Sequence, residues 1–166
     1  MRIFEELPEG LDETWTHGVL VGGMASAPND LEIARAYRAA AGALIGPALA
    51  GGEAWNFTYP ILFLYRHALE LYLKAIVRPA RLNHDLGPLL DAFQVIVCER
   101  CKQEIPESVR EDLQVFAGLD AMGLRYSHNL KGRWSGLPGE YWVSLTNLET
   151  KMDAIFDALE RVHLDL

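Results

Sequence analysis

Cysteine is scarce in this sequence: of its 166 residues only two are cysteines, Cys98 and Cys101. Their CxxC spacing is compatible with half of a zinc site or with a redox pair, but no second cysteine pair and no HxxxH motif accompanies it. We therefore interpret them as two incidental thiols of a reducing cytoplasm. We expect neither a metal nor another cofactor.

Basic residues are also few compared with acidic ones. The chain has 15 lysines and arginines against 23 aspartates and glutamates, for a formal net charge of −8. A protein that coats nucleic acid needs a basic face, because its affinity comes from neutralising phosphates. The charge balance therefore argues against a broad phosphate-binding surface and leaves room for a small local RNA site.

Long uncharged apolar runs are missing as well. No run reaches the ~18–20 residues of a membrane span without a charge, and Met1–Glu13 carries acidic residues where a signal peptide has an apolar core. We expect a cytoplasmic protein with no membrane contact. There is also no βαβ alternation and no glycine-rich loop after a strand, which argues against the Rossmann and P-loop nucleotide folds.

What the sequence does contain is helical periodicity. The stretch Tyr59–Val77 is apolar around most of its circumference, so we expect it to form a central helix, with Thr58 as its cap. Apolar spacing predicts four more helices: Leu31–Leu49, Asp85–Glu99, Glu107–Met122 and Ser144–His163. The sequence thus predicts a single all-α domain, an antiparallel bundle of about five helices over 31–166 preceded by an arm over 1–30.

The segment Gly123–Val143 has a different character. It combines glycines and a proline with large aromatic rings, which predicts a long ordered loop, with a short hairpin as an option, before the last helix. Loops of this length are usually functional. Trp134, Tyr141 and Trp142 are able to stack on bases, but such rings more often anchor a loop to a core or to a dimer face.

Four polar residues interrupt the central helix: Arg66, His67, Glu70 and Lys74. At about 100° per residue they fall on one side of it and form a polar stripe. A stripe of this kind faces solvent, lines a cavity, or is buried and internally paired, and the sequence leaves all three open. Its simplest role is a ladder of ion pairs at i,i+4 spacing.

Three pieces of the chain carry a family likeness. The sequences LYRHALELYLKAIV (64–77), HDLGPLL (84–90) and GLRYSHNLKG (123–132), followed by an amphipathic last helix, resemble the HEPN superfamily of small helical-bundle proteins. The likeness covers about Thr58 to the C-terminus. HEPN domains are often dimers, so the resemblance implies a homodimer. Many HEPN members are metal-independent RNases of toxin–antitoxin or antiphage systems, and others bind RNA or serve structural roles without catalysis.

Active members of the superfamily carry an arginine, four to six residues, then a histidine, between the later helices. At that place this chain has Arg125, Tyr126 and His128, with only two residues in the gap. A second arrangement, Arg78 and His84 with five residues between them, lies earlier, between the second and third predicted helices. The motif is not expected there.

Metal-free RNA cleavage through the 2′-hydroxyl needs a base that titrates near neutral pH and a fixed cation for the developing phosphorane charge. The resemblance implies that His128 moves the proton and Arg125 holds the phosphate. Supporting or binding roles fall to Arg66, His67, Glu70, Lys74 and Tyr126.

Three functional hypotheses follow. The first is a HEPN-like protein that acts on RNA in bacterial defence. The second is a non-catalytic module whose aromatic loop and arm bind a protein partner, such as an antitoxin, or a second copy. The third is binding of a free nucleotide through Arg66 and Lys74.

Overall fold

The computed structural model describes residues 28–52, 54–80, 84–119, 123–125 and 141–165. In these ranges the chain is all-α, with five α-helices and no strand, which confirms the predicted helical bundle. The α-helices are α1 (Asp30–Ala50), α2 (Trp55–Val77), α3 (Leu86–Ile96), α4 (Glu107–Gly118) and α5 (Leu145–Leu164). Most of the predicted arm and of the aromatic loop lies outside the described residues, so the hairpin stays a prediction.

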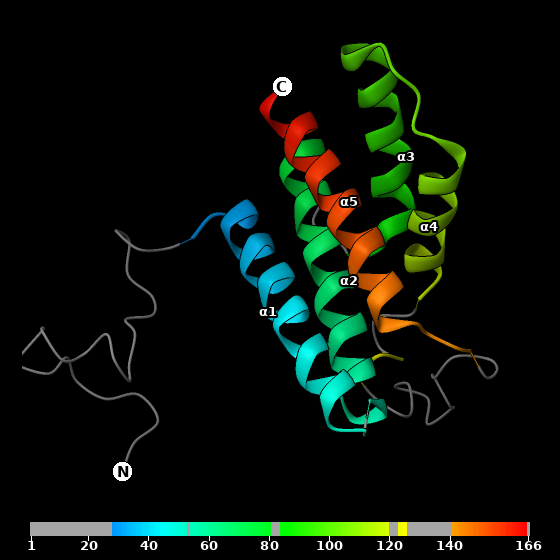
Figure 1. The fold of residues 1–166 in the computed structure, drawn as a ribbon. Helices are drawn as coiled ribbons and strands as arrows, with labels where there is room; N and C mark the ends of the chain where they lie inside the picture. The colour runs from blue at the N-terminus through cyan, green and yellow to red at the C-terminus, as the bar shows by residue number, and fades with distance from the viewer. Residues whose placement is uncertain (1–27, 53, 81–83, 120–122, 126–140, 166) are drawn as a thin grey trace, which may run out of the picture.

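Helix α2 is the central element, as its apolar circumference predicts. It lies between α1 on one side and the α3–α4 pair on the other, with α5 packed across it (Figure 1). Its largest fully buried side chains, Tyr65 and Tyr72, contact Phe156 of α5, with ring centroids 6.0 and 5.1 Å apart. These rings join α2 and α5 through the middle of the core.

The α1–α2 hairpin follows local capping rules. Helix α1 begins with a capping box between Asn29 and Glu32 and ends at Ala50, with Gly51 as its C-cap. Gly52 then adopts a left-handed φ of +67° that suits glycine. Helix α2 begins at Trp55, four residues before the predicted start. Thr58 is therefore not the cap: it lies in the first turn, where its hydroxyl donates to the carbonyl of Ala54 at 2.8 Å.

Helix α5 begins as predicted, with Ser144 as its N-cap. Ion pairs fasten it to α1, between Arg35 and Glu160 and between Arg38 and Asp153. The Glu160 side chain is only 21% exposed, and it accepts a hydrogen bond from the Tyr72 hydroxyl at 2.7 Å. It lies between helices because two neighbouring elements, α1 through Arg35 and α2 through Tyr72, supply it with hydrogen-bond donors.

In α3 and in α4 the C-terminal end of the helix differs from the prediction. Helix α3 continues as a π-helical turn, η2 (Val97–Cys101), which carries the two free cysteines, with Cys98 exposed. Helix α4 ends at Gly118 instead of Met122, because Leu119 takes an extended conformation with ψ of 117°. The carbonyl of Leu119 therefore points away from helix α4.

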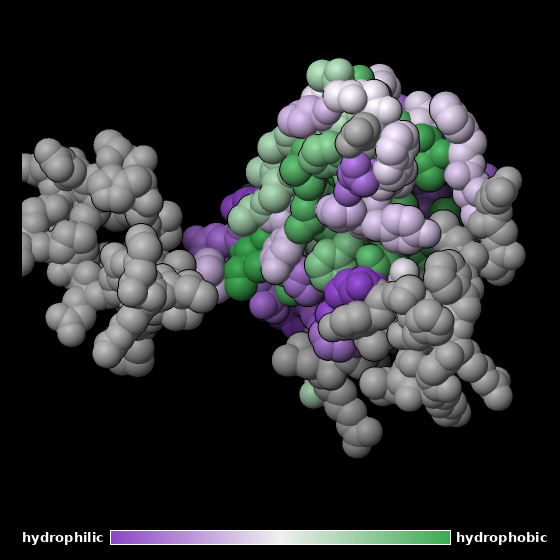
Figure 2. All heavy atoms as spheres, turned by 90° about the horizontal axis from the view of Figure 1, so that it is seen from below, coloured by the Kyte–Doolittle hydropathy of each residue, from purple (hydrophilic) through white to green (hydrophobic). Residues whose placement is uncertain are grey.

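Both hydrophilic and hydrophobic residues reach the surface of the bundle when it is viewed from below (Figure 2). Near the turn between α1 and α2 the exposed large apolar residues are Leu49, Trp55 and Tyr59.

No helix in the described ranges combines the length and the apolar character that crossing a membrane requires.

Candidate functional site

The polar stripe of α2 is buried and internally paired. Arg66, Glu70 and Lys74 are 5%, 1% and 8% exposed. The Glu70 carboxylate lies at the centre: the Lys74 Nζ donates to its Oε1 at 2.6 Å, and the Arg66 Nη1 donates to its Oε2 at 3.4 Å. Since each partner is one helical turn away, α2 alone provides this geometry. Of the three environments that the sequence left open, the structure therefore selects burial with internal pairing.

Arg66 also ties two other elements to α2. Its Nε donates to the carbonyl of Leu119 and its Nη2 donates to the carbonyl of His84, both at 3.0 Å. Leu119 follows the last residue of α4, and His84 precedes α3. Helix ends leave carbonyls and amides without intrahelical partners, so a buried guanidinium that satisfies two carbonyls stabilises the arrangement of all three helices.

His84 completes the cluster. Its Nδ1 lies 2.8 Å from the Oε1 of Glu70, while its side chain is 80% exposed. Asp85 fixes the backbone next to it by capping α3, accepting from the amide of Gly87 at 3.0 Å. An ionised carboxylate only accepts hydrogen bonds, so Nδ1 carries the hydrogen and the Nε2 of the neutral ring is an acceptor. A carboxylate-held imidazole with an accessible nitrogen is the arrangement of a general base.

Sequence reasoning did not select His84 as a site residue. Two signals pointed to it: the five-residue gap after Arg78, and its position directly before the α3 cap. The five-residue gap does not by itself indicate a site, because it lies between the second and third helices, where the motif is not expected. We refer to Arg66, Glu70, Lys74 and His84 as the Glu70 cluster.

The Glu70 cluster keeps its carboxylate charged. Burial alone would raise the pKa of Glu70, but hydrogen bonds from Lys74 and His84, together with the charge of Lys74, hold that pKa below its ordinary value. The cluster contains two permanent side-chain cations, Arg66 and Lys74, against one anion. The side chains of the cluster therefore carry a formal charge of +1 when His84 is neutral, although the whole chain is acidic.

His67 faces a different environment from the rest of the stripe. Its ring makes an edge contact with Tyr37 of α1 at 4.6 Å between centroids and stacks on Phe63 at 5.9 Å. Desolvation lowers the pKa of this imidazole, so the neutral form is favoured. These contacts make His67 a packing residue between α1 and α2 in the described structure.

Arg125 lies against α2, two helical turns from Glu70. Its guanidinium carbon is 5.4 Å from the centroid of the Phe63 ring, a cation–π contact, and the buried Leu124 anchors this end of the segment. Phe63 and Glu70 are seven residues apart, so they share a face of α2 at an axial separation of about 10 Å. The structure thus brings Arg125 and His84 to the same side of the central helix.

The other two residues of the predicted RNA-cleaving motif, Tyr126 and His128, lie outside the described residues. The geometry of Arg125 with His128 stays a prediction. Within the described ranges, histidines, cysteines and carboxylates do not gather in a group of three or more that would hold a metal ion.

The fold and the Glu70 cluster define this protein as a small α-helical bundle organised around a buried, carboxylate-centred charge cluster. Comparison with known proteins takes it no further: no protein-family model, no curated protein and no solved structure matches the chain. The HEPN likeness rests on the sequence motifs.

Proposed function

We propose that this protein is a HEPN-like endoribonuclease that works without a metal ion, with His84 and Arg125 at its site. The observation that carries the proposal is the pairing of the His84 Nδ1 with the Glu70 carboxylate at 2.8 Å, on a side chain that is 80% exposed. A histidine held in this way has a defined tautomer, and a strand of RNA is able to reach its Nε2.

The chemistry is a transfer to the 2′-hydroxyl. The Nε2 of His84 takes the proton of the 2′-hydroxyl, the resulting oxygen attacks the adjacent phosphorus, and the bond from phosphorus to the 5′ oxygen breaks. The products are a 2′,3′-cyclic phosphate and a 5′-hydroxyl, whose proton comes from the predicted second histidine, His128. Glu70 stabilises the imidazolium that forms on His84, and Arg125 stabilises the charge on the phosphate oxygens.

The sequence resemblance supports the biological part of the proposal. From this resemblance we propose that the protein forms a homodimer in which two such sites face one another. We also propose a cytoplasmic location and a role in toxin–antitoxin or antiphage defence. The acidic net charge of −8 fits local recognition of a single-stranded segment better than coating of long RNA.

The test is an RNase assay in EDTA on structured and unstructured RNAs. It compares the unmodified protein with His84→Ala and with the double variant Arg125→Ala/His128→Ala, and circular dichroism checks that all are folded. Arg100→Ala, a change at an exposed arginine on η2, is the matched control. We expect cleavage to be lost in both site variants and kept in the control. Cleavage that survives in His84→Ala contradicts the role of His84 as the base. Absence of cleavage by the unmodified protein contradicts the proposed nuclease activity.

A second candidate is a non-catalytic interaction module. Tyr141 and Trp142, which lead into α5, are 63% and 94% exposed, and exposed large aromatic rings are typical of interaction surfaces. Under this hypothesis Trp142→Ala lowers self-association in sedimentation velocity, and no RNA is cleaved. RNA cleavage that depends on His84, with association unchanged in Trp142→Ala, contradicts it.

A further inference from the structure

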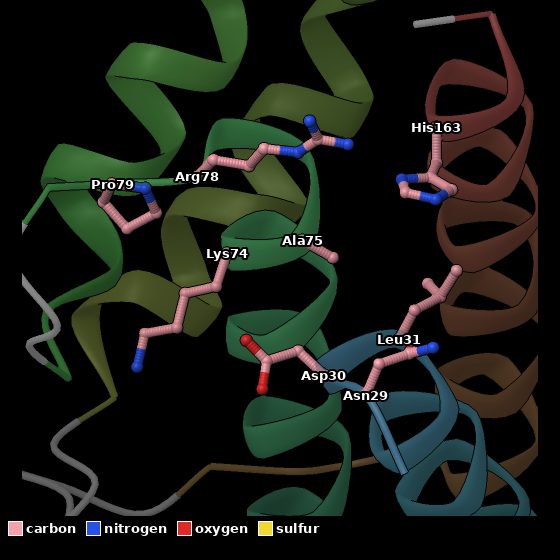
Figure 3. Close-up of a pocket in the computed structure, with 8 residues that line it drawn as sticks. All are labelled: Asn29, Asp30, Leu31, Lys74, Ala75, Arg78, Pro79 and His163. Atoms are coloured by element: carbon pink, nitrogen blue, oxygen red, sulfur yellow. The ribbon is translucent and has the colours of Figure 1, made fainter.

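A second site lies at the end of the bundle where α2 and α5 terminate and α1 begins. It is a cavity of about 490 Å³ between these three helix ends (Figure 3). Its lining residues are Asn29, Asp30, Leu31, Lys74, Ala75, Arg78, Pro79 and His163. A volume of this size is ordinary for a pocket that holds a small organic molecule.

Arg78 supplies the positive charge of the cavity. Its side chain extends from the C-cap of α2 toward His163 of α5, and the two approach each other across the opening (Figure 3). Among the described residues, the Arg78 guanidinium has neither a hydrogen bond nor an ion pair. The backbone beneath it is fixed in a left-handed conformation with φ of 51°, and its N–H donates to the Lys74 carbonyl at 2.8 Å. A planar guanidinium on a fixed base is suited to bind phosphate or carboxylate oxygens in pairs.

Lys74 lines the same cavity, but its ammonium group is already paired with the Glu70 carboxylate. Its ammonium donates to Glu70, and its side chain points away from His163 (Figure 3). Arg66 is buried and donates to the carbonyls of Leu119 and His84. The two cations that the sequence suggested for a free nucleotide are thus engaged inside the bundle, and Arg78 with His163 takes their place.

The wall of the cavity opposite Arg78 carries hydrogen-bond acceptors. The amide oxygen of Asn29 already accepts a hydrogen bond from the backbone N–H of Glu32, so the carboxylate of Asp30 is the acceptor that this wall offers to a ligand. Leu31 and Ala75 add apolar surface between the two ends. A matching ligand carries an anion at one end, hydroxyl or amino donors at the other, and an apolar or ring-shaped middle.

We propose that this cavity binds a small organic phosphate of the size of a nucleoside monophosphate. Its phosphate lies between Arg78 and His163, and its sugar or base donors face Asp30. The proposal does not depend on RNA cleavage, because it uses neither His84 nor Arg125.

Isothermal titration calorimetry on the full chain tests it, with adenosine 5′-monophosphate, guanosine 5′-monophosphate, adenosine and inorganic phosphate as probes. We expect at least one nucleotide to bind at least about tenfold more tightly than inorganic phosphate, and adenosine to bind weakly. The variant Arg78→Asn removes the charge and keeps a residue that tolerates the left-handed backbone, so it should lower nucleotide affinity at least about tenfold without unfolding the protein.

Two further variants separate the ends of the ligand. Asp30→Asn should weaken the nucleotide and leave inorganic phosphate unchanged, and His163→Gln should weaken both. Arg161→Ala, at an exposed arginine two residues before His163 and outside the cavity lining, is the control and should bind as the unmodified protein does. Nucleotide binding that is unchanged in Arg78→Asn, or no binding of either nucleotide, overturns the proposal. Neither result bears on the RNase assay, which is scored on His84 and Arg125.

Discussion

The exposed ring of His84 is held by the buried carboxylate of Glu70, with 2.8 Å between Nδ1 and Oε1. The two residues belong to different elements: Glu70 is in the middle of α2, and His84 is in the connection before α3. The same carboxylate also accepts from Lys74 and Arg66, so one buried anion links an ion-pair ladder to a residue at the surface. The stability of the bundle and the chemistry of His84 therefore depend on the same group.

Removing the charge of Glu70 should destabilise the bundle strongly. In Glu70→Gln the side chains of Arg66 and Lys74 remain buried without a carboxylate partner, and breaking a buried ion pair in this way typically costs about 3–5 kcal/mol. Urea denaturation followed by circular dichroism measures the free energy of unfolding. Glu111→Gln, at an exposed position of α4, is the matched control and should change it by less than about 0.5 kcal/mol. A loss below about 1 kcal/mol in Glu70→Gln would show that the cluster relaxes around the amide.

Replacing Arg66 should loosen two helix ends in particular. Arg66→Met keeps the apolar part of the side chain and removes the donors to the part-buried carbonyls of Leu119 and His84. A hydrogen bond from a charged group typically contributes about 1.5–3 kcal/mol, and partial exposure of the acceptors places the loss toward the lower end of that range. Hydrogen exchange should become faster at the start of α3 and the end of α4, with α1 little changed. Arg161→Met serves as the control. Uniformly faster exchange in all helices would contradict a role confined to these two connections.

Acid should weaken the attachment of α5 to α1. Hydrogen bonds from Arg35 lower the pKa of Glu160 to about 2, further than its partial burial raises it, so the folded state holds this carboxylate ionised more strongly than the unfolded chain does. A lowered folded-state pKa gives stability that is complete above the ordinary glutamate pKa of about 4.3 and is lost as the pH falls through the folded value. The free energy of unfolding should therefore decline from about pH 5 toward pH 2.

The variant Glu160→Gln isolates this contribution. Its unfolding free energy should be lower than that of the unmodified protein at pH 7, and the difference should shrink on acidification. Thermal and urea unfolding at several pH values provide the measurement. An equal difference at pH 7 and pH 3 would show that Glu160 acts by packing and by its neutral hydrogen bond from Tyr72, not by charge.

His84 should affect catalysis much more than folding. If it is the base, His84→Ala lowers single-turnover RNA cleavage by about 10²–10⁴-fold, the usual contribution of a positioned proton-transfer group. RNA affinity should stay nearly the same, since Arg125 provides the phosphate contact. Because the side chain is 80% exposed, the free energy of unfolding should fall by less than about 1 kcal/mol. Equal losses of affinity and of cleavage rate would indicate an RNA-binding residue instead.

Local signals predicted most of the helices. The apolar spacing placed the starts of α1, α3 and α5 within a residue or two, and in the structure Asn29, Asp85 and Ser144 cap these helices. The start of α2 and the end of α4 were misplaced. In both cases the boundary depends on a carbonyl contact, that of Ala54 with Thr58 and that of Leu119 with Arg66, which residue preferences do not reveal.

Helical periodicity within each segment is enough to predict the helical class, the central position of α2 and the presence of one polar stripe. The packing of the helices is what buries the stripe, places His67 against Tyr37, and brings His84 and Arg125 along one side of α2. These features depend on packing because the donors and acceptors of the Glu70 cluster come from separate elements, and Leu119 is 53 residues from Arg66 in the chain. Such pairings form when helices pack, and no pattern within a single helix encodes them.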